Sequence, residues 1–151
     1  MIGEKEKQVI YMGSDHAGFK VKEGLRSHLE AEGYAVTDLG VFSEAPADYP
    51  DIAREVSEKV LEREGARGIL ICGTGIGVAM TANKYKGIRT VNAVSKDMAE
   101  MGRRHNNANI LALGARLSNL DEMKEITDTF LHTNFEEKED RHVRRVKKID
   151  G

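Results

Sequence analysis

The sequence is poor in residues that mark several functional classes. Its 151 residues include one cysteine, two prolines, no tryptophan and only 5% aromatic side chains. A single cysteine cannot form an internal disulfide, which favours the reducing cytoplasm as the compartment. Few aromatic rings leave little surface for stacking bases, and a net charge of −2 creates no basic field. We therefore expect no nucleic-acid partner.

Long apolar runs are missing as well. None approaches the roughly 20 residues that a membrane-spanning helix needs, so we expect no membrane partner. The first residues, MIGEKEKQ, are charged and lack the apolar centre of a secretory signal. With 40% hydrophobic and 32% charged residues, the chain fits one globular domain over 1–151, including an N-terminal extension at 1–8.

What the sequence does contain is an alternation of short apolar runs and amphipathic stretches. Runs that predict strands lie at 9–12, 34–39, 68–72, 88–94 and 110–113. Helical patterns lie at 19–32, 52–63 and 76–84, after Ser95, and from Ser118 or Asn119 to about 131. Residues 45–50, with both prolines, are predicted to be a loop, and the tail at 134–151 extended or weakly helical. The alternation favours an α/β fold, a three-layer, doubly wound domain with a five-stranded parallel sheet.

Ligands of such sheets bind beyond the carboxyl ends of the strands. Segments rich in glycine and polar residues follow the first, third and fifth predicted strands, at 13–18, 72–77 and 114–116. The carboxyl ends of parallel strands share one edge of the sheet, so we expect a site where these segments meet.

The loop after the third predicted strand contains the lone cysteine and three glycines. It reads Cys72, Gly73, Thr74, Gly75, Ile76, Gly77. It leads into a helix N-terminus, whose free N–H groups and dipole favour anions and the reactive thiolate of a nearby cysteine. A thiolate here could act as a nucleophile or a base, whereas a buried free cysteine is otherwise a small apolar residue. The glycines either permit a tight turn or cradle an anion, and Thr74 is either a proton donor or a turn residue.

Other polar residues could belong to the site, but each can also be explained by a purely structural role. Asp15 and His16 follow the first strand, where an N-cap aspartate and a surface histidine would suffice. His105 comes late in the fourth helix, where a histidine can merely interact with the dipole. These three residues and Cys72 could bind zinc, but no closely spaced ligand pair supports that, so we expect no metal. Near the end of the chain, Arg141 and Arg145 could clamp a phosphate or form a solvated face.

The motifs resemble those of one family along nearly the whole chain. They are GSDHAGFK (13–20), DYPD (48–51), GILICGTGIG (68–77), ANK (82–84), GIR (87–89), HNNAN (105–109), LALGAR (111–116) and RHVRRV (141–146). In this order they resemble the type B ribose-5-phosphate isomerases, in the wider family that includes galactose-6-phosphate isomerase subunits. The resemblance implies a Rossmann-like domain that works as a homodimer, or as a dimer of dimers.

The resemblance also implies an activity. This is the interconversion of ribose 5-phosphate and ribulose 5-phosphate through a cis-enediolate, without a cofactor, in the pentose phosphate pathway. A hexose 6-phosphate isomerase acting on allose or galactose 6-phosphate is the alternative, since phosphate contacts and proton transfer would be shared. A non-catalytic nucleotide-binding module is a further alternative, because the glycine loop could bind a phosphate, although it would explain neither Cys72 nor the C-terminal arginines.

Roles carry over residue by residue from the resemblance. Cys72 is implied to be the base, with Thr74 assisting proton transfer, and Asp15 and His105 to open the sugar ring. The implied anion hole consists of Gly73, Gly75, Ile76 and Gly77. The implied substrate-binding residues are His16, Tyr49, Asn106, Arg116, Arg141, His142 and Arg145. The segment 134–151 is implied to reach the partner subunit, so that His105 and the arginines serve the neighbour's Cys72.

Overall fold

The computed structural model describes residues 8–151. The predicted N-terminal extension, 1–8, therefore lies outside the described residues except for Gln8. Five parallel strands form one sheet: β1 (Val9–Ser14), β2 (Ala35–Asp38), β3 (Arg67–Cys72), β4 (Thr90–Asn92) and β5 (Ile110–Gly114). Their order is β2-β1-β3-β5-β4. All five predicted strands are confirmed.

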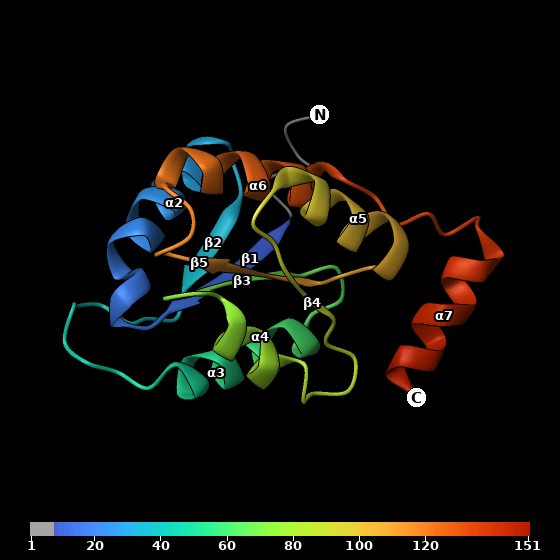
Figure 1. Ribbon diagram of the computed structural model, residues 1–151, viewed down its shortest axis with the longest axis horizontal. Coiled ribbons are helices and arrows are strands. Elements are labelled where there is room, and N and C mark those ends of the chain that lie inside the picture. The colour runs from blue at the N-terminus through green and yellow to red at the C-terminus, as the bar shows by residue number, and fades with distance from the viewer. Residues whose placement is uncertain (1–7) are drawn as a thin grey trace.

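Helices cover both faces of this sheet (Figure 1). The helical elements of the described residues are the 3₁₀ turn η1 (His16–Gly18), α2 (Phe19–Ala31), α3 (Tyr49–Glu62), α4 (Ile76–Ala82), α5 (Lys96–Asn106), α6 (Leu120–His132) and α7 (Asp140–Asp150), the last of which does not cover the sheet. In Figure 1, α2, α5 and α6 lie above the sheet, and α3 and α4 lie below it. The predicted three-layer, doubly wound α/β fold is therefore confirmed.

Two apolar clusters hold the layers together. Neighbouring residues of a strand point to opposite faces, so Ile69 and Leu70 of β3 enter different clusters. Ile69 belongs to the cluster that contains Leu29 of α2 and Phe130 of α6. Leu70 belongs to the one that contains Val56 of α3. The central strand is thereby buried on both sides, and its carboxyl end is held firmly in place.

Helix starts agree with the predicted caps with one exception. The Ser95 side chain caps α5 by accepting from the Met98 N–H, and Asn119 forms a capping box with Glu122 at the start of α6. The exception is α3, which begins at Tyr49 and contains Pro50 in its first turn. The prediction of a loop over 45–50 was therefore wrong for residues 49 and 50. The first N–H groups of a helix have no partner within the helix, so a proline, which lacks an N–H, is tolerated in the first turn.

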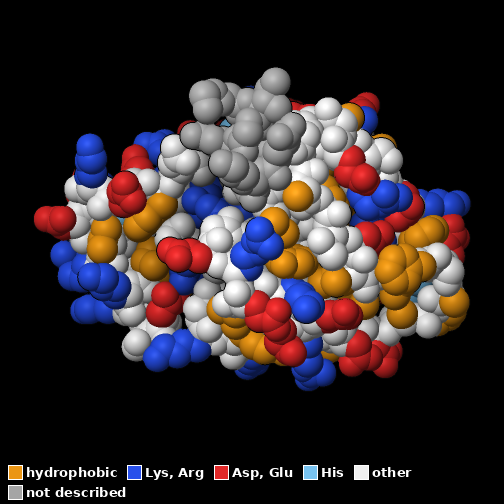
Figure 2. Space-filling model, turned by 180° about the vertical axis from the view of Figure 1, so that it is seen from behind, with side chains coloured by type: hydrophobic (Ala, Val, Ile, Leu, Met, Phe, Trp, Pro, Cys, Tyr) orange, Lys and Arg blue, Asp and Glu red, His pale blue; other side chains and the backbone are white. Residues whose placement is uncertain are grey.

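The C-terminal tail is more ordered than its sequence predicted. Instead of an extended or weakly helical tail, residues 140–150 form α7, which stands apart from the layered body beyond the end of α5 (Figure 1). His142 and Val146 are buried on one side of this helix. Figure 2 shows Lys and Arg side chains gathered at this end of the molecule, with hydrophobic side chains between them.

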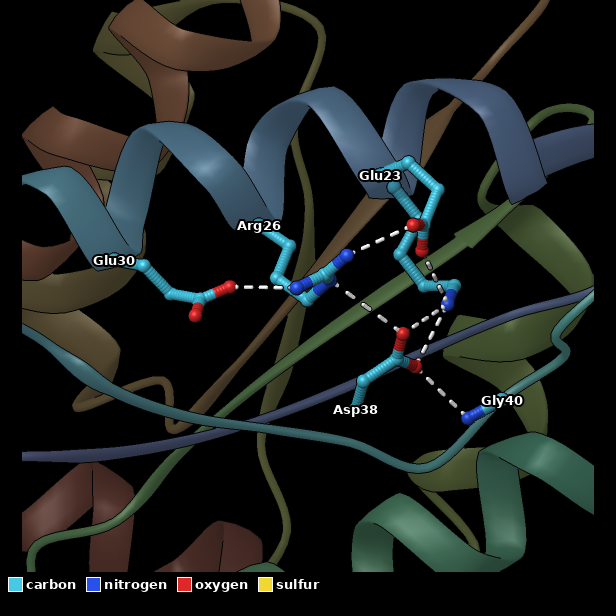
Figure 3. A network of polar contacts seen from close by, with 6 residues as sticks. Glu23, Arg26, Glu30, Asp38 and Gly40 are labelled. Atoms are coloured by element: carbon cyan, nitrogen blue, oxygen red, sulfur yellow. Dashed lines mark hydrogen bonds and ion pairs between the residues drawn. The ribbon is translucent and has the colours of Figure 1, made fainter.

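A buried ion pair ties α2 to the edge of the sheet (Figure 3). The Lys22 side chain is fully buried, and its Nζ lies 2.7 and 2.6 Å from the two carboxylate oxygens of Asp38. Asp38 Oδ1 also accepts a hydrogen bond of 2.9 Å from the Gly40 N–H. Nearby on the same helix, Arg26 pairs with Glu30 on the exposed side. The two pairs provide a matched comparison of buried and exposed charge.

We expect Asp38→Asn to lower the free energy of unfolding by about 3 kcal/mol, because it leaves the buried Lys22 ammonium with only the longer contact of 3.4 Å to Glu23 as a counter-charge. Glu30→Gln, which removes the exposed pair with Arg26, should cost less than about 1 kcal/mol. Urea denaturation of both variants measures the difference. Equal costs would show that Lys22 finds another partner or reaches water.

Candidate active site

Three loops converge at the carboxyl edge of the sheet. The Asp15 N–H donates to the Ile71 carbonyl at 3.2 Å, which joins the loop after β1 to the end of β3. The Ala115 N–H donates to the Cys72 carbonyl at 2.8 Å, and the Arg116 N–H to the Gly73 carbonyl at 2.9 Å. The segments after β1, β3 and β5 therefore meet, as the sequence predicted.

Cys72 lies at the centre of this junction. It is buried, and its Sγ accepts a hydrogen bond of 3.2 Å from the Gly75 N–H. Gly75 is the N-cap residue of α4 and has a φ of +81°. Glycine adopts this left-handed backbone conformation without steric cost. The Ile76 N–H donates to Thr74 Oγ1 at 3.2 Å. The sulfur atom is therefore fixed in position by a backbone N–H donor at the start of α4.

Glycines let large side chains approach the loop. A Cβ on Gly77 would lie 2.4 Å from Cε1 of Tyr49, so the Tyr49 ring packs directly on the first turn of α4. A Cβ on Gly73 would lie 3.1 Å from Nη1 of Arg116, so this guanidinium lies over the loop. Tyr49 and Arg116 therefore flank the loop of residues 73–77 with a phenol and a positive charge, although they come from α3 and the loop after β5.

Asp15 and His16 complete this group. The Asp15 carboxylate accepts from the Gly18 N–H at 3.1 Å, so it does act as an N-cap, as its simpler interpretation held. His16 Nδ1 accepts from the Ala47 N–H at 3.1 Å. In the neutral ring Nε2 then carries the proton and remains available as a donor. His16 thereby links the loop after β1 to the segment before α3.

The other five predicted site residues lie away from the carboxyl edge of the sheet, at the end of α5 and on α7. Helix α5 begins beyond the carboxyl end of β4 and runs back for 11 residues, about 16 Å. Its last residues, His105 and Asn106, precede the amino end of β5, where the Gly68 N–H donates to the Asn109 carbonyl. Helix α7 carries the remaining three, Arg141, His142 and Arg145. A single chain therefore does not bring these five residues to Cys72.

This second group is organised around a carboxylate that the sequence did not single out. The rings of His105 and His142 stack with centroids 4.4 Å apart. Glu136 Oε1 lies 3.5 Å from His105 Nε2 and 3.4 Å from His142 Nε2, and Oε2 lies 2.9 Å from Nη2 of Arg104. The hydrogen bond from Arg104 holds the pKa of the Glu136 carboxyl below its usual value. Glu136 sits in the charged tract FEEKED, which contains no local signal that distinguishes it.

A second residue missed by the sequence reasoning is Asn92, at the end of β4. Its Oδ1 is buried without a hydrogen-bond partner among residues 8–151 and lies 2.5 Å from where a Cβ on Gly75 would be. Asn92 and Asn106 both line a groove of about 740 Å³ that runs past residues 83–92, α5 and the end of α7. The groove therefore reaches from the end of β4 to the last residues of α5 and α7.

The fold and the site define a class of doubly wound α/β proteins that bind their ligands at the carboxyl edge of the sheet. In this chain the central strand ends in a thiol, and the glycine loop after it caps a helix. The chain belongs to the Ribose/Galactose Isomerase family, which it matches over residues 10–149. The resemblance found in the sequence motifs is thereby confirmed.

Individual relatives agree over nearly the full length. The ribose-5-phosphate isomerase B of Escherichia coli is 41% identical over 140 residues, 93% of each protein. A crystal structure of a ribose 5-phosphate isomerase from Thermotoga maritima superposes with a TM-score of 0.91 and 45% identity, covering 95% of this chain and 98% of that one. The crystal structure of the ribose-5-phosphate isomerase B of Mycoplasma genitalium with bound ribulose-5-phosphate superposes with a TM-score of 0.89. Its sequence is 42% identical, and the match covers 95% of each chain. Within residues 8–151, none of the helices is long and apolar enough to span a membrane.

Proposed function

We propose that this chain interconverts ribose 5-phosphate and ribulose 5-phosphate as a cofactor-independent sugar-phosphate isomerase. The observation that carries the proposal is the Cys72 thiol, hydrogen-bonded by the Gly75 N–H at the meeting point of three strand ends. The similarity to a structure with bound ribulose-5-phosphate supports a pentose phosphate as the ligand. The reaction belongs to the pentose phosphate pathway.

The chemistry requires a proton to move between two neighbouring carbons. The Cys72 thiolate removes the proton from C2 of the open-chain aldose, and the electron pair moves onto the C1 oxygen to give a cis-enediolate. Return of the proton to C1 forms the ketose and regenerates the thiolate. Thr74 moves a proton between O1 and O2, and Asp15 with His105 opens the ring beforehand. The N–H groups of the loop from Gly73 to Gly77, including that of Ile76, stabilise the oxygen charge.

The phosphate needs more positive charge than one chain brings to Cys72. His16 and Arg116 lie on the Cys72 side, whereas Arg141, His142 and Arg145 lie on α7. We therefore place each active site between two subunits of a homodimer, or of a pair of such dimers. In this arrangement α7 of one subunit supplies the phosphate clamp. His105 and Asn106, at the end of α5 in the same subunit, meet Cys72 and Tyr49 of the partner subunit.

Exposed apolar side chains support this assembly. They lie on α4 and α5, the two helices that contact the edge strand β4, and on the segment before α5: Ile76, Met80, Val94, Met98 and Met101. Several large apolar side chains left exposed along one edge of the sheet are consistent with a surface that another protein covers. For the compartment we propose the cytoplasm, because a lone thiol that serves as a base has to stay reduced.

A substrate panel tests the function. We expect ribose 5-phosphate to have a larger kcat/KM than allose or galactose 6-phosphate, because one more carbon changes the distance between the phosphate clamp and the thiolate. A displacement of about 1 Å can cost about a hundredfold in rate. Protein treated with a chelator should retain its rate. A larger kcat/KM for either hexose phosphate would support the alternative, a hexose 6-phosphate isomerase.

For the base, we expect Cys72→Ala to abolish nearly all turnover and to leave substrate binding largely intact, since the base acts on the barrier whereas phosphate contacts also exist in the ground state. Calorimetric binding and coupled kinetics measure the two effects. In deuterium oxide, the wild type should exchange label into the product, and Cys72→Ala should not. Turnover close to wild type in Cys72→Ala would assign the proton transfer to another residue.

For the shared site, we expect two inactive variants to complement each other. Cys72→Ala is mixed with Arg141→Ala/Arg145→Ala and the subunits are allowed to exchange. A heterodimer then has one site with both defects and one intact site, so activity recovers to at most about one quarter of wild type. Mass spectrometry confirms that exchange has occurred. Exchange without any recovery would mean that each subunit builds its own site.

A further inference from the structure

The contacts of Glu136 with the two histidines are longer than direct hydrogen bonds. Oε1 lies 3.5 Å from His105 Nε2 and 3.4 Å from His142 Nε2. These separations are longer than the roughly 2.7–3.2 Å of N–H···O hydrogen bonds. They agree with the spacing between two ligands of a tetrahedral zinc ion, about 3.3–3.4 Å for metal–ligand distances of about 2.0–2.1 Å. All three ligand atoms lie within 4.8 Å of one another.

We propose that His105, Glu136 and His142 bind a divalent transition-metal ion of the zinc type, and that the bound ion inhibits the enzyme. Two imidazole nitrogens and one carboxylate oxygen suit zinc rather than magnesium or calcium, and three such ligands leave a fourth position open. The inhibitory part rests on the proposed function, because a metal on His105 withdraws that ring from the sugar.

The surroundings of the three residues fit such a site. The Glu136 N–H donates to the Arg104 carbonyl at 3.0 Å, and its Oε2 is held by the Arg104 guanidinium, so Oε1 is left facing the two rings. Metal-binding carboxylates are commonly fixed by a second hydrogen bond in this way. His142 is buried, whereas the side chains of His105 and Glu136 are about one third exposed, which provides an entry path.

A second cluster offers a contrast within the same chain. His28 Nε2 lies 2.7 Å from Glu32 Oε1 and 3.0 Å from Asp128 Oδ1. These are the lengths of direct hydrogen bonds, so hydrogen bonding accounts for this cluster without a metal. His28 therefore serves as the control histidine, and Glu137, an exposed neighbour of Glu136, serves as the control carboxylate.

Titration with Co²⁺ tests the site, because its visible absorption bands report tetrahedral coordination. The experiment uses the full-length Cys72→Ala protein, so that the thiol cannot contribute. We expect about one equivalent of Co²⁺ per chain, displaced by Zn²⁺. Glu136→Gln should weaken binding at least tenfold, whereas Glu137→Gln and His28→Gln should not change it. If Glu136→Gln unfolds, His105→Gln replaces it, since that side chain is about one third exposed.

Three results would overturn the site: no tetrahedral bands, bands that survive in both Glu136→Gln and His105→Gln, or bands that only His28→Gln removes. A kinetic arm with otherwise wild-type protein tests inhibition. Zn²⁺ should lower turnover, a chelator should restore it, and Glu136→Gln should keep its own metal-free rate when Zn²⁺ is added. Tetrahedral binding with full activity would instead show that His105 takes no part in turnover, which separates the metal site from the proposed function.

Discussion

A helix that follows a strand in a parallel sheet has to run back to the other edge of the sheet, and this constraint determines where the functional side chains lie. The strand places its last residue at the carboxyl edge, and the helix places its last residue at the amino edge. Cys72 ends a strand, whereas His105 ends a helix. No local rearrangement brings these two residues together, because about 16 Å of α5 lies between the two edges. A second copy of the chain provides the simplest way to combine them.

The carboxyl edge itself depends on close backbone packing. The Cys72 loop is bonded to the segment after β5 through the carbonyls of Cys72 and Gly73. A Cβ on Gly114 would lie 2.6 Å from the Thr74 carbonyl oxygen, so only glycine lets the two loops meet. The Gly75 N–H can then be aimed at sulfur before any ligand arrives. Donors arranged in advance need no reorganisation during the reaction, which is the main source of electrostatic catalysis.

Local signals in the sequence were enough to predict the sheet, the helix caps and the loop around Cys72. Ser95 and Asn119 satisfy the N–H groups of their own helices, so their effect is independent of distant residues. Failures occurred where tertiary contacts decide. Helix α7 is amphipathic but consists mostly of charged residues, and it is held by residues remote in sequence. Glu136 acquires its role only through Arg104, some 32 residues away in the sequence. The strand order, in which β5 lies between β3 and β4, likewise has no local signal.

Helix α7 stands apart from the body of the chain, yet it is fixed at both ends. Glu136 joins the segment before it to Arg104 of α5, and at its far end Asp150 accepts two hydrogen bonds of 2.8 Å from Arg89. Between these anchors Arg141 and Arg145 are exposed, one helical turn apart. A flexible tail would lose conformational entropy on closing over a phosphate, and that loss would weaken binding. Because the helix is already ordered in the single chain, pairing of two subunits can deliver both arginines in a fixed geometry.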